Sequence, residues 1–352
     1  MDVGRQSSIA PPAPRAIPPA PVTMRNPFPP VPAMAATQSG RTQKIWRDGQ
    51  LIDWADAQIH VMSHVVHYGS SVFEGVRCYE TPGGGAVYRL RDHMRRLADS
   101  ARIYRMPMRY SIETMMQAVI DTVNANGLTH CYLRPIVLRT GEQMGVLPSQ
   151  DPELTETFVV AYNWGAYLGD GSLENGVDVH VSSWRRAAPD TFPTLAKAGG
   201  NYLNSQLSKM QAQLDGYSEG IMLDSQGLIS EGSAMNLFVV RDEVLYTSSV
   251  ASGILNGITR DSVMTIARDL GYEVREQALP REFLYIADEV FFTGTGAEIT
   301  PVRSIDRIPV GSGKPGPICH AVQTEFLGIA RGTIDDRHGW LTPVAEPVGA
   351  AR

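Results

Sequence analysis

Residues 230–260 read SEGSAMNLFVVRDEVLYTSSVASGILNGITR and contain the signals from which the fold of this chain can be inferred. After the acidic residue Glu231, two runs of β-branched and aromatic residues flank the polar tripeptide RDE, which predicts the two strands of a hairpin. NGITR then leads into a helix beginning near Thr259, and the backbone amides of Gly257, Ile258 and Thr259 are expected at its positive end. Such a helix end can bind an anion, although an ordinary capped helix would have the same sequence pattern.

Lysine is scarce and occurs only as Lys44, Lys197, Lys209 and Lys314. Lys44 borders the N-terminal tail and Lys314 lies in the loop GSGKPG, so both are expected in water. Lys209 is expected on the solvent face of the helix predicted over NYLNSQLSKMQAQLDG, because it lies off the apolar stripe formed by Leu203, Leu207, Met210 and Leu214. Lys197, in TLAKAGG, has an apolar setting, which favours the uncharged amine that can attack a carbonyl group. A surface lysine on a connecting loop is the alternative.

Length, charge and cysteine content restrict the class of protein. A chain of 352 residues exceeds the roughly 100 to 200 residues of one domain, so two domains are expected. The formal net charge of −6, without a basic cluster, gives no reason to expect nucleic acid or a membrane surface as a partner. Cys78, Cys131 and Cys319 are far apart in the sequence and odd in number, which argues against a disulfide framework or a zinc site. A cytoplasmic protein with a small-molecule ligand is expected.

Composition divides the chain into four parts of mixed α+β character. Residues 1–40 are rich in proline and poor in core-forming residues, so a disordered tail is predicted, with a misassigned start codon as an alternative. Residues 41–160 are predicted to form a smaller N-terminal α/β domain. Residues 161–174 are predicted as the interdomain loop and residues 175–352 as the larger C-terminal domain.

Apolar residues at helical spacing predict two helices in the N-terminal domain. One extends from Leu90 to Tyr104, and the other is capped by Ser111 and ended by Gly127. PGGGA is expected to turn a hairpin, and neither VGSGKPG nor TGTGAE has the spacing of an ATP or NAD site. The three histidines between residues 60 and 67 are predicted on a strand entering a turn, without the further ligands of a metal site.

Pyridoxal phosphate (PLP) has an aldehyde, a pyridine nitrogen and a phosphate. A lysine in an apolar setting, an acid and an anion-binding helix end can bind these three groups in that order. At these residues the sequence resembles the class IV aminotransferases of fold type IV, and among them the bacterial branched-chain amino acid aminotransferases. The resemblance extends from about residue 44 to 345 and includes HYGSSVFEGVRCY, RDHMRRLADSARIYRMP, YLRP, MGVLP and TGTGAEITPVRS. Its signature residues are Glu231, Ser233, Asn236, Leu237, Phe238, Leu245, Thr247, Leu255, Gly257, Ile258 and Arg260.

The resemblance implies a role for each matching residue and a two-domain fold with a C-terminal PLP-binding domain. Lys197 would be catalytic, carrying PLP as an internal aldimine and then moving a proton to and from the substrate Cα. Glu231 would face the pyridine nitrogen, within a set of cofactor-binding positions made up of Arg91, Lys197, Tyr202, Glu231, Gly257, Ile258, Thr259 and Thr295. The substrate-binding positions are Phe73, Gly75, Tyr132, Arg134, Trp164, Tyr167, Thr295 and Gly296, with Tyr68 and Val146 reaching in from a neighbouring subunit.

The implied activity is amino-group transfer between L-leucine, L-isoleucine or L-valine and 2-oxoglutarate, by a homodimer or higher homo-oligomer. Tyr132 and Arg134 are two apart on a predicted strand and so share a face, where Arg134 is expected to accept the second carboxylate of glutamate. A D-amino acid or (R)-amine transaminase, an aminodeoxychorismate lyase and a cofactor-binding protein without activity are alternatives. Ala234, Met235 and Asn256 depart from common family residues and put the substrate range in question.

Overall fold

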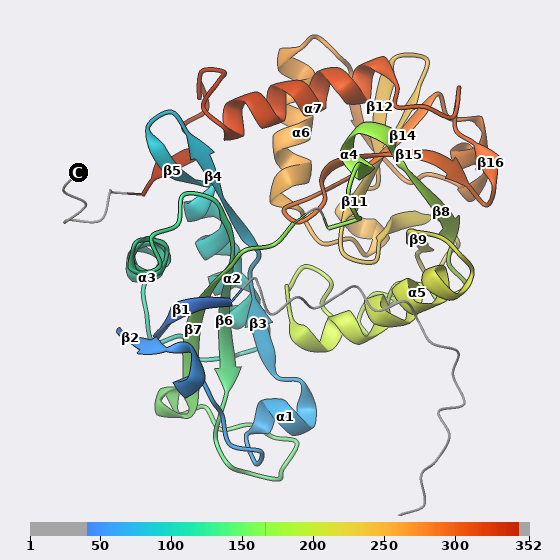
Figure 1. Ribbon diagram of the computed structural model, residues 1–352. Coiled ribbons are helices and arrows are strands. Elements are labelled where there is room, and N and C mark those ends of the chain that lie inside the picture. Colours follow the sequence, from blue (N-terminus) through green and yellow to red (C-terminus); the bar gives the residue numbers. More distant parts are fainter. Residues whose placement is uncertain (1–40, 166, 345–352) are drawn as a thin grey trace, which may run out of the picture.

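The computed structural model describes residues 41–165 and 167–344, which form two β-sheets with helices packed against them (Figure 1). This architecture confirms the predicted α+β class. The tail predicted at residues 1–40 lies outside the described residues. The helices are α1 (His64–Tyr68), α2 (Leu90–Ile103), α3 (Ile112–Ala125), α4 (Ser172–Asn175), α5 (Tyr202–Leu214), α6 (Ile258–Asp269) and α7 (Pro317–Ala330).

The first sheet is antiparallel in all its described pairings, with strand order β17-β5-β4-β6-β7-β1-β2 and β3 paired to β6. PGGGA turns the β4–β5 hairpin, as predicted. The strands are β1 (Arg41–Arg47), β2 (Gln50–Asp53), β3 (Ser71–Phe73), β4 (Val76–Thr81), β5 (Gly84–Tyr88), β6 (Cys131–Arg139), β7 (Thr155–Tyr162) and β17 (Leu341–Pro343).

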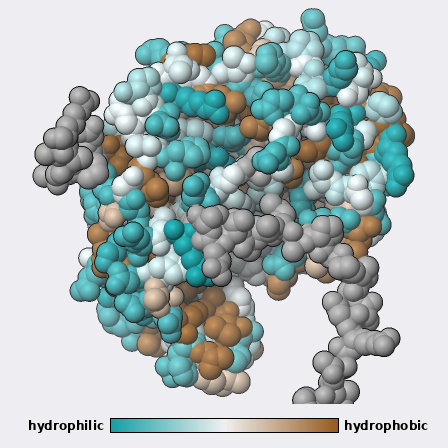
Figure 2. Space-filling view, viewed as in Figure 1, coloured by the Kyte–Doolittle hydropathy of each residue, from teal (hydrophilic) through white to brown (hydrophobic). Residues whose placement is uncertain are grey.

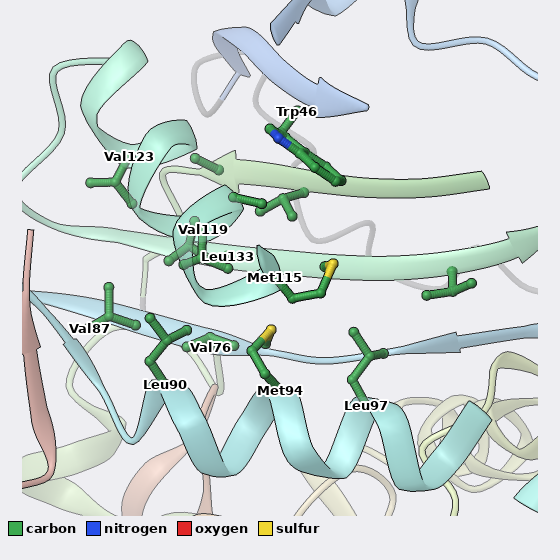
Figure 3. Packing of buried hydrophobic residues seen from close by; sticks show 14 of the residues in the cluster. Trp46, Val76, Val87, Leu90, Met94, Leu97, Met115, Val119, Val123 and Leu133 are labelled. Atoms are coloured by element: carbon green, nitrogen blue, oxygen red, sulfur yellow. The ribbon is translucent and has the colours of Figure 1, made fainter. Parts of the chain in front are cut away.

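Helices α2 and α3 confirm the two helices predicted for the first half of the chain. Figure 3 shows Leu90, Met94 and Leu97 on one side of α2, pointing toward the buried side chains of the sheet and of α3. The Ser111 hydroxyl caps α3 by accepting a hydrogen bond from the Thr114 amide at 3.2 Å. Burial of this apolar stripe fixes α2 against the sheet, which matters because another face of α2 reaches the cavity described below.

The second sheet is mixed, with order β10-β9-β8-β15-β14-β11-β12-β13 and β16 paired to β15. Its β11–β12 hairpin confirms the hairpin predicted from NLFVVRDEVLYT. Asp242 and Glu243 form the turn, with positive φ angles of 50° and 62°. Helices α6 and α7 pack on β14, whereas α5 packs on β9 (Figure 1). The strands are β8 (Val177–Val181), β9 (Glu219–Leu223), β10 (Ile229–Gly232), β11 (Asn236–Arg241), β12 (Val244–Thr247), β13 (Val274–Glu276), β14 (Glu289–Gly294), β15 (Glu298–Ile305) and β16 (Ile308–Pro309).

The orientation predicted for α5 was wrong. Its apolar stripe is exposed, Leu203 to 63%, while Ser205, Ser208 and Ala212 are buried. The helix lies so close to β9 that a Cβ added to Gly220 would be 2.6 Å from the Ser208 hydroxyl oxygen, so only small residues fit between them. Lys209 is therefore not on the solvent face: its ammonium is paired with the buried Glu219.

Three further features of the fold bear on the expectations from the sequence. Strand β17 returns to the first sheet and pairs with β5, so the segment from residue 175 onward is not confined to the second sheet. Cys78 and Cys131, far apart in the sequence, are direct partners across β4 and β6, and both are buried free thiols. The histidine segment predicted as a strand contains the short helix α1, which Gly69 ends at a φ of 64°.

Candidate active site

A cavity of about 320 Å³ lies between the two halves of the molecule, and both sheets contribute to its wall. Most of the residues expected to bind cofactor or substrate line it, whereas Arg91, Tyr68 and Val146 do not. The expected residues in the wall are Phe73, Gly75, Tyr132, Arg134, Trp164, Tyr167, Lys197, Tyr202, Glu231, Gly257, Ile258, Thr259, Thr295 and Gly296.

Lys197 is held firmly at this wall. Its Nζ donates a hydrogen bond to the Tyr202 hydroxyl oxygen at 2.5 Å and lies 4.9 Å from the centroid of the Phe73 ring. Its backbone amide donates to the Ser100 hydroxyl of α2 at 2.9 Å, and its carbonyl accepts from the Phe73 amide at 3.0 Å. The amine thus lies close to two aromatic rings, on a backbone that is hydrogen-bonded to Phe73 and Ser100.

Glu231 is the acid of the cavity, with only 5% of its surface exposed. Its Oε1 lies 2.9 Å from Arg186 Nη2, and its Oε2 accepts hydrogen bonds from the Leu255 amide at 3.1 Å and from Asn236 Nδ2 at 2.9 Å. Burial raises the pKa of Glu231, and the opposite charge of Arg186 is the largest influence that lowers it. Arg186 therefore favours the ionised carboxylate in a site that water barely reaches.

The N-terminus of α6 forms another part of the wall. Gly257 is its N-cap residue, and the amides that follow, at Ile258 and Thr259, have no acceptor within the helix. A Cβ on Gly257 would lie 1.9 Å from Asn236 Oδ1, so the close approach of hairpin and helix requires glycine. The helix end thus offers unsatisfied donors and a positive potential to an anion.

Arg91 was the wrong arginine for this anion site. Its side chain is 62% exposed on the surface of α2, where it pairs with Glu113. Arg96 of the same helix lines the cavity instead, and its Nη1 donates to the Asn256 carbonyl at 3.0 Å, directly before the α6 N-terminus. Arg96, which the sequence analysis did not predict, therefore supplies a cation at the N-terminus of α6.

A buried carboxylate, itself paired with a buried histidine, holds Arg96 in place. Glu74 is fully buried and accepts from Arg96 Nε at 2.7 Å and from Arg96 Nη2 at 2.8 Å, while His93 Nδ1 lies 2.7 Å from the same carboxylate. Burial by itself would raise the pKa of Glu74, but the charge and hydrogen bonds of Arg96 hold it well below its usual range. The two-pronged pairing fixes the guanidinium plane beside the cavity.

Aromatic side chains form the part of the cavity assigned to the substrate. The Tyr132 and Trp164 rings meet edge to face at 4.7 Å, and Trp164 and Tyr167 do so at 5.4 Å. A Cβ on Gly75 would lie 1.9 Å from the Tyr132 hydroxyl oxygen, so this glycine makes room for that hydroxyl. Such walls suit a branched aliphatic side chain.

Arg134 lies among these rings without an acidic partner. Its guanidinium carbon is 4.6 Å from the Phe73 ring centroid, and its Nη2 donates a long hydrogen bond of 3.5 Å to the Tyr132 hydroxyl. Its buried Nε has no hydrogen-bond partner, and within residues 41–165 and 167–344 no carboxylate oxygen lies within 4 Å of it. The cavity therefore contains a cation that can receive an anionic group.

The backbone of Thr295 and Gly296 is tied to the first sheet by a buried arginine. Arg77 of β4 donates from Nε to the Thr295 carbonyl and from Nη2 to the Gly296 carbonyl, each at 3.2 Å. Glu298, 3.8 Å from Arg77 Nη1, balances the charge. Because both carbonyls turn toward Arg77, this loop is held in a single orientation at the cavity wall.

Sequence reasoning missed Arg96, Arg186, Glu74 and Arg77. Two signals were present: Glu74 and Arg77 lie in HYGSSVFEGVRCY, and Arg96 lies in RDHMRRLADSARIYRMP, both of which are segments that carry the resemblance. What the sequence could not supply was the pairing of these charges across the cavity.

Two findings concern the described part of the chain as a whole. No helix in residues 41–165 or 167–344 is long and apolar enough to cross a membrane. The same residues bring together no group of three or more His, Cys, Asp or Glu side chains with the geometry of a metal site.

Comparison with known proteins gives consistent matches. The model of the amino-transferase class IV family matches residues 71–305. The branched-chain-amino-acid aminotransferase of Salmonella typhimurium is 53% identical over 300 residues, which cover 85% of this chain and 97% of that protein. A crystal structure of the Escherichia coli branched-chain amino acid aminotransferase superposes with a TM-score of 0.85 at 52% identity, covering 87% of this chain and 100% of that one. A T.th. branched-chain amino acid aminotransferase complexed with N-(5'-phosphopyridoxyl)-L-glutamate has a TM-score of 0.82 at 43% identity. The match covers 86% of this chain and 99% of that one.

Proposed function

Because this chain belongs to the amino-transferase class IV family, we propose that its cavity exchanges an amino group between L-leucine, L-isoleucine or L-valine and 2-oxoglutarate, with PLP as cofactor. Branched-chain amino acid transamination is the activity of its curated relatives at 52–53% identity. One observation carries the proposal: Lys197 Nζ lies 2.5 Å from the Tyr202 hydroxyl in a cavity that also contains Glu231 and the start of α6.

The residues present fit PLP. The cavity wall contains an amine at Lys197, a buried carboxylate at Glu231, free amides at the α6 N-terminus and the guanidinium of Arg96. Thr293 contributes a buried hydroxyl that has no partner in the described structure. When bound, the cofactor supplies a carbonyl for amine attack and a ring that accepts electrons from the substrate Cα.

Lys197 moves the proton in this proposal. With PLP held in the cavity, Lys197 Nζ would be the base that takes the proton from the substrate Cα and the acid that gives a proton back. The Tyr202 hydroxyl and the Phe73 ring hold Nζ in position during this transfer. The backbone hydrogen bonds of Lys197 limit its movement, so the amine stays within reach of the reacting carbon.

Glu231 would keep the cofactor ring nitrogen protonated. An ionised carboxylate opposite that nitrogen favours the ring cation, which is the stronger electron acceptor. Arg186, the Leu255 amide and Asn236 all favour the ionised form of Glu231. Arg96 and the first amides of α6 would hold the phosphate of the cofactor.

Arg134 would let one cavity accept two unlike substrates. Aromatic walls would bind the branched side chain, and the unpaired guanidinium would donate hydrogen bonds to the second carboxylate of glutamate or 2-oxoglutarate. The T.th. relative has been crystallised with a phosphopyridoxyl derivative of L-glutamate, which supports a glutamate half-reaction in this family.

A homodimer or larger homo-oligomer, in the cytoplasm, is part of the proposal. Val146 is 76% exposed, and Tyr68, also exposed, donates to the Met144 carbonyl at 2.6 Å. Figure 2 shows hydrophobic surface gathered at the end of the molecule where α1 lies in Figure 1. Such a patch supports contact with a second copy, whose Tyr68 and Val146 would close the cavity. The division at residues 41–160, 161–174 and 175–352 likewise remains a proposal.

A comparison of substrates tests the reaction. Purified protein should change the absorption of its bound cofactor with L-leucine and form glutamate from 2-oxoglutarate. A response to D-alanine or an (R)-amine, with none to L-leucine, would contradict the proposal and favour another enzyme of the same fold.

Lys197→Ala tests the catalytic lysine. The variant is expected to lose turnover and the cofactor linkage that borohydride reduction and mass spectrometry detect, because the amine is removed. Lys44→Ala is the matched control, since Lys44 pairs with Asp53 on the surface. A linkage that survives in Lys197→Ala would show that another amine holds the cofactor.

A further inference from the structure

A buried ion pair lies directly behind the cavity and has no part in the mechanism above. Lys209 of α5 donates to Glu219 Oε2 at 2.9 Å and to the Ser218 carbonyl at 2.6 Å. Glu219 is fully buried, and the side chain of Lys209 is 21% exposed. Neither residue lines the cavity, but each contacts a residue that does.

Glu219 reaches the wall through its second oxygen. Its Oε1 accepts hydrogen bonds from the Gly220 amide at 2.9 Å and from the Ser233 amide at 3.1 Å. Ser233, Ala234 and Met235 follow Glu231 in the chain and line the cavity. The carboxylate thus fixes the backbone at the start of this wall segment.

Lys209 reaches a different part of the wall. Its ammonium lies 5.6 Å from the centroid of the Tyr167 ring, close enough for a cation–π contact. The same ring packs against the core of the second sheet and also bears on the cavity, where it meets Trp164 edge to face and a Cβ on Gly296 would lie 3.5 Å from its Cδ2. One ammonium therefore sets the position of a ring that bears on both an aromatic wall and the Thr295–Gly296 loop.

We propose that Lys209 is a positioning residue that sets the shape of the substrate side-chain pocket. Its ammonium contacts Tyr167 directly and reaches the Ser233 amide through Glu219. The inference rests on the proposed transaminase function and assigns a determinant of substrate affinity outside the cavity. A carboxylate without contact with water requires a cation, so removal of the ammonium forces Glu219 and the Ser233 segment to rearrange. The cofactor residues Lys197, Glu231 and Arg96 do not contact this pair, so the chemical step is expected to be spared.

The test uses full-length holoenzyme and steady-state kinetics with leucine, isoleucine and valine. Lys209→Met is expected to raise the KM for these substrates about twofold to fivefold, the effect of losing a cation–π contact of a partly exposed ammonium, with kcat nearly unchanged. Lys209→Arg should restore most of the affinity. Lys44→Met, which removes a surface ion pair with Asp53, is the control and should leave both constants unchanged.

A second variant covers the case in which Lys209→Met does not fold. Lys209→Met combined with Glu219→Gln removes both charges, which folded proteins tolerate better than removal of one, and should also raise KM. An unchanged KM in the folded variants would overturn the role of Lys209. So would a loss of kcat that parallels the fall in Tm and that Lys209→Arg does not restore. A wild-type protein inactive toward all three amino acids would instead overturn the proposed function.

Discussion

Replacement of Arg134 by methionine should separate the two half-reactions of the enzyme. The guanidinium lies 4.6 Å from the Phe73 ring centroid and 3.5 Å from the Tyr132 hydroxyl, and no carboxylate of the described residues is within 4 Å. Methionine retains much of the side-chain volume against Phe73 but removes the charge. The variant is therefore expected to leave the wall in place for a branched side chain.

The size of the effect follows from the contact that is lost. Loss of a charge-assisted hydrogen bond to the second carboxylate of glutamate costs ~1.5 to 3 kcal/mol. That cost lowers kcat/KM for glutamate and 2-oxoglutarate roughly tenfold to a hundredfold. For leucine only the contact of the cation with Phe73 is lost, which corresponds to about fivefold or less.

Single-turnover measurements of each half-reaction decide between the explanations. The aldehyde form of the holoenzyme is mixed with leucine or with glutamate, and its amino form with 2-oxoglutarate or the leucine-derived oxo acid. Equal losses for the two kinds of substrate would refute the reasoning, because they would assign Arg134 to the fold or to the carboxylate that both share.

Other variants test the remaining parts of the site. Arg96→Lys should weaken cofactor binding about tenfold, because the fork at the α6 N-terminus is lost while a charge stays beside Glu74; Arg91→Lys on the same helix should not. Arg186→Met should move the acid limb of the kcat/KM pH profile to higher pH, since loss of the opposite charge further raises the pKa of Glu231; an unmoved limb would contradict this role. Gly75→Ala should displace the Tyr132 hydroxyl and raise KM for both kinds of substrate about tenfold, whereas Gly83→Ala, whose Cβ would have its nearest neighbour at 3.8 Å, should match the wild type.

Apolar spacing predicted helices more reliably than it predicted what their faces contact. The stripe of α2 that contains Leu90, Met94 and Leu97 is buried as expected, because large side chains there fill the space beside the first sheet. The stripe of α5 is exposed, because the contact with β9 is too close for anything but serine and alanine. Spacing indicates that a face is apolar, but not which surface covers it.

Prediction of the candidate site had the same limit, because a local pattern does not show what a side chain contacts. Lys197 stood out because lysine is scarce, and Glu231 and the α6 N-terminus stood out because their local pattern has a direct chemical meaning. From the sequence alone, Arg91 and Arg96 are equally plausible as the arginine that binds the anion. They lie about 140° apart around α2, and only the packing of that helix shows that Arg96 faces the cavity. Pairing across the cavity, as between Arg186 and Glu231, is a tertiary contact that no local pattern encodes.

The pairing of β17 with β5 has a consequence for the order in which the protein is completed on the ribosome. Leu341 and Thr342 pair with Tyr88 and Val87, so the edge of the first sheet is covered by nearly the last residues that the structure describes. Until these residues are synthesised, the hydrogen-bonding groups along the outer edge of β5 face solvent or other nascent chains. The N-terminal half can therefore form early in synthesis but is expected to remain open to aggregation until residues 341–343 have been synthesised.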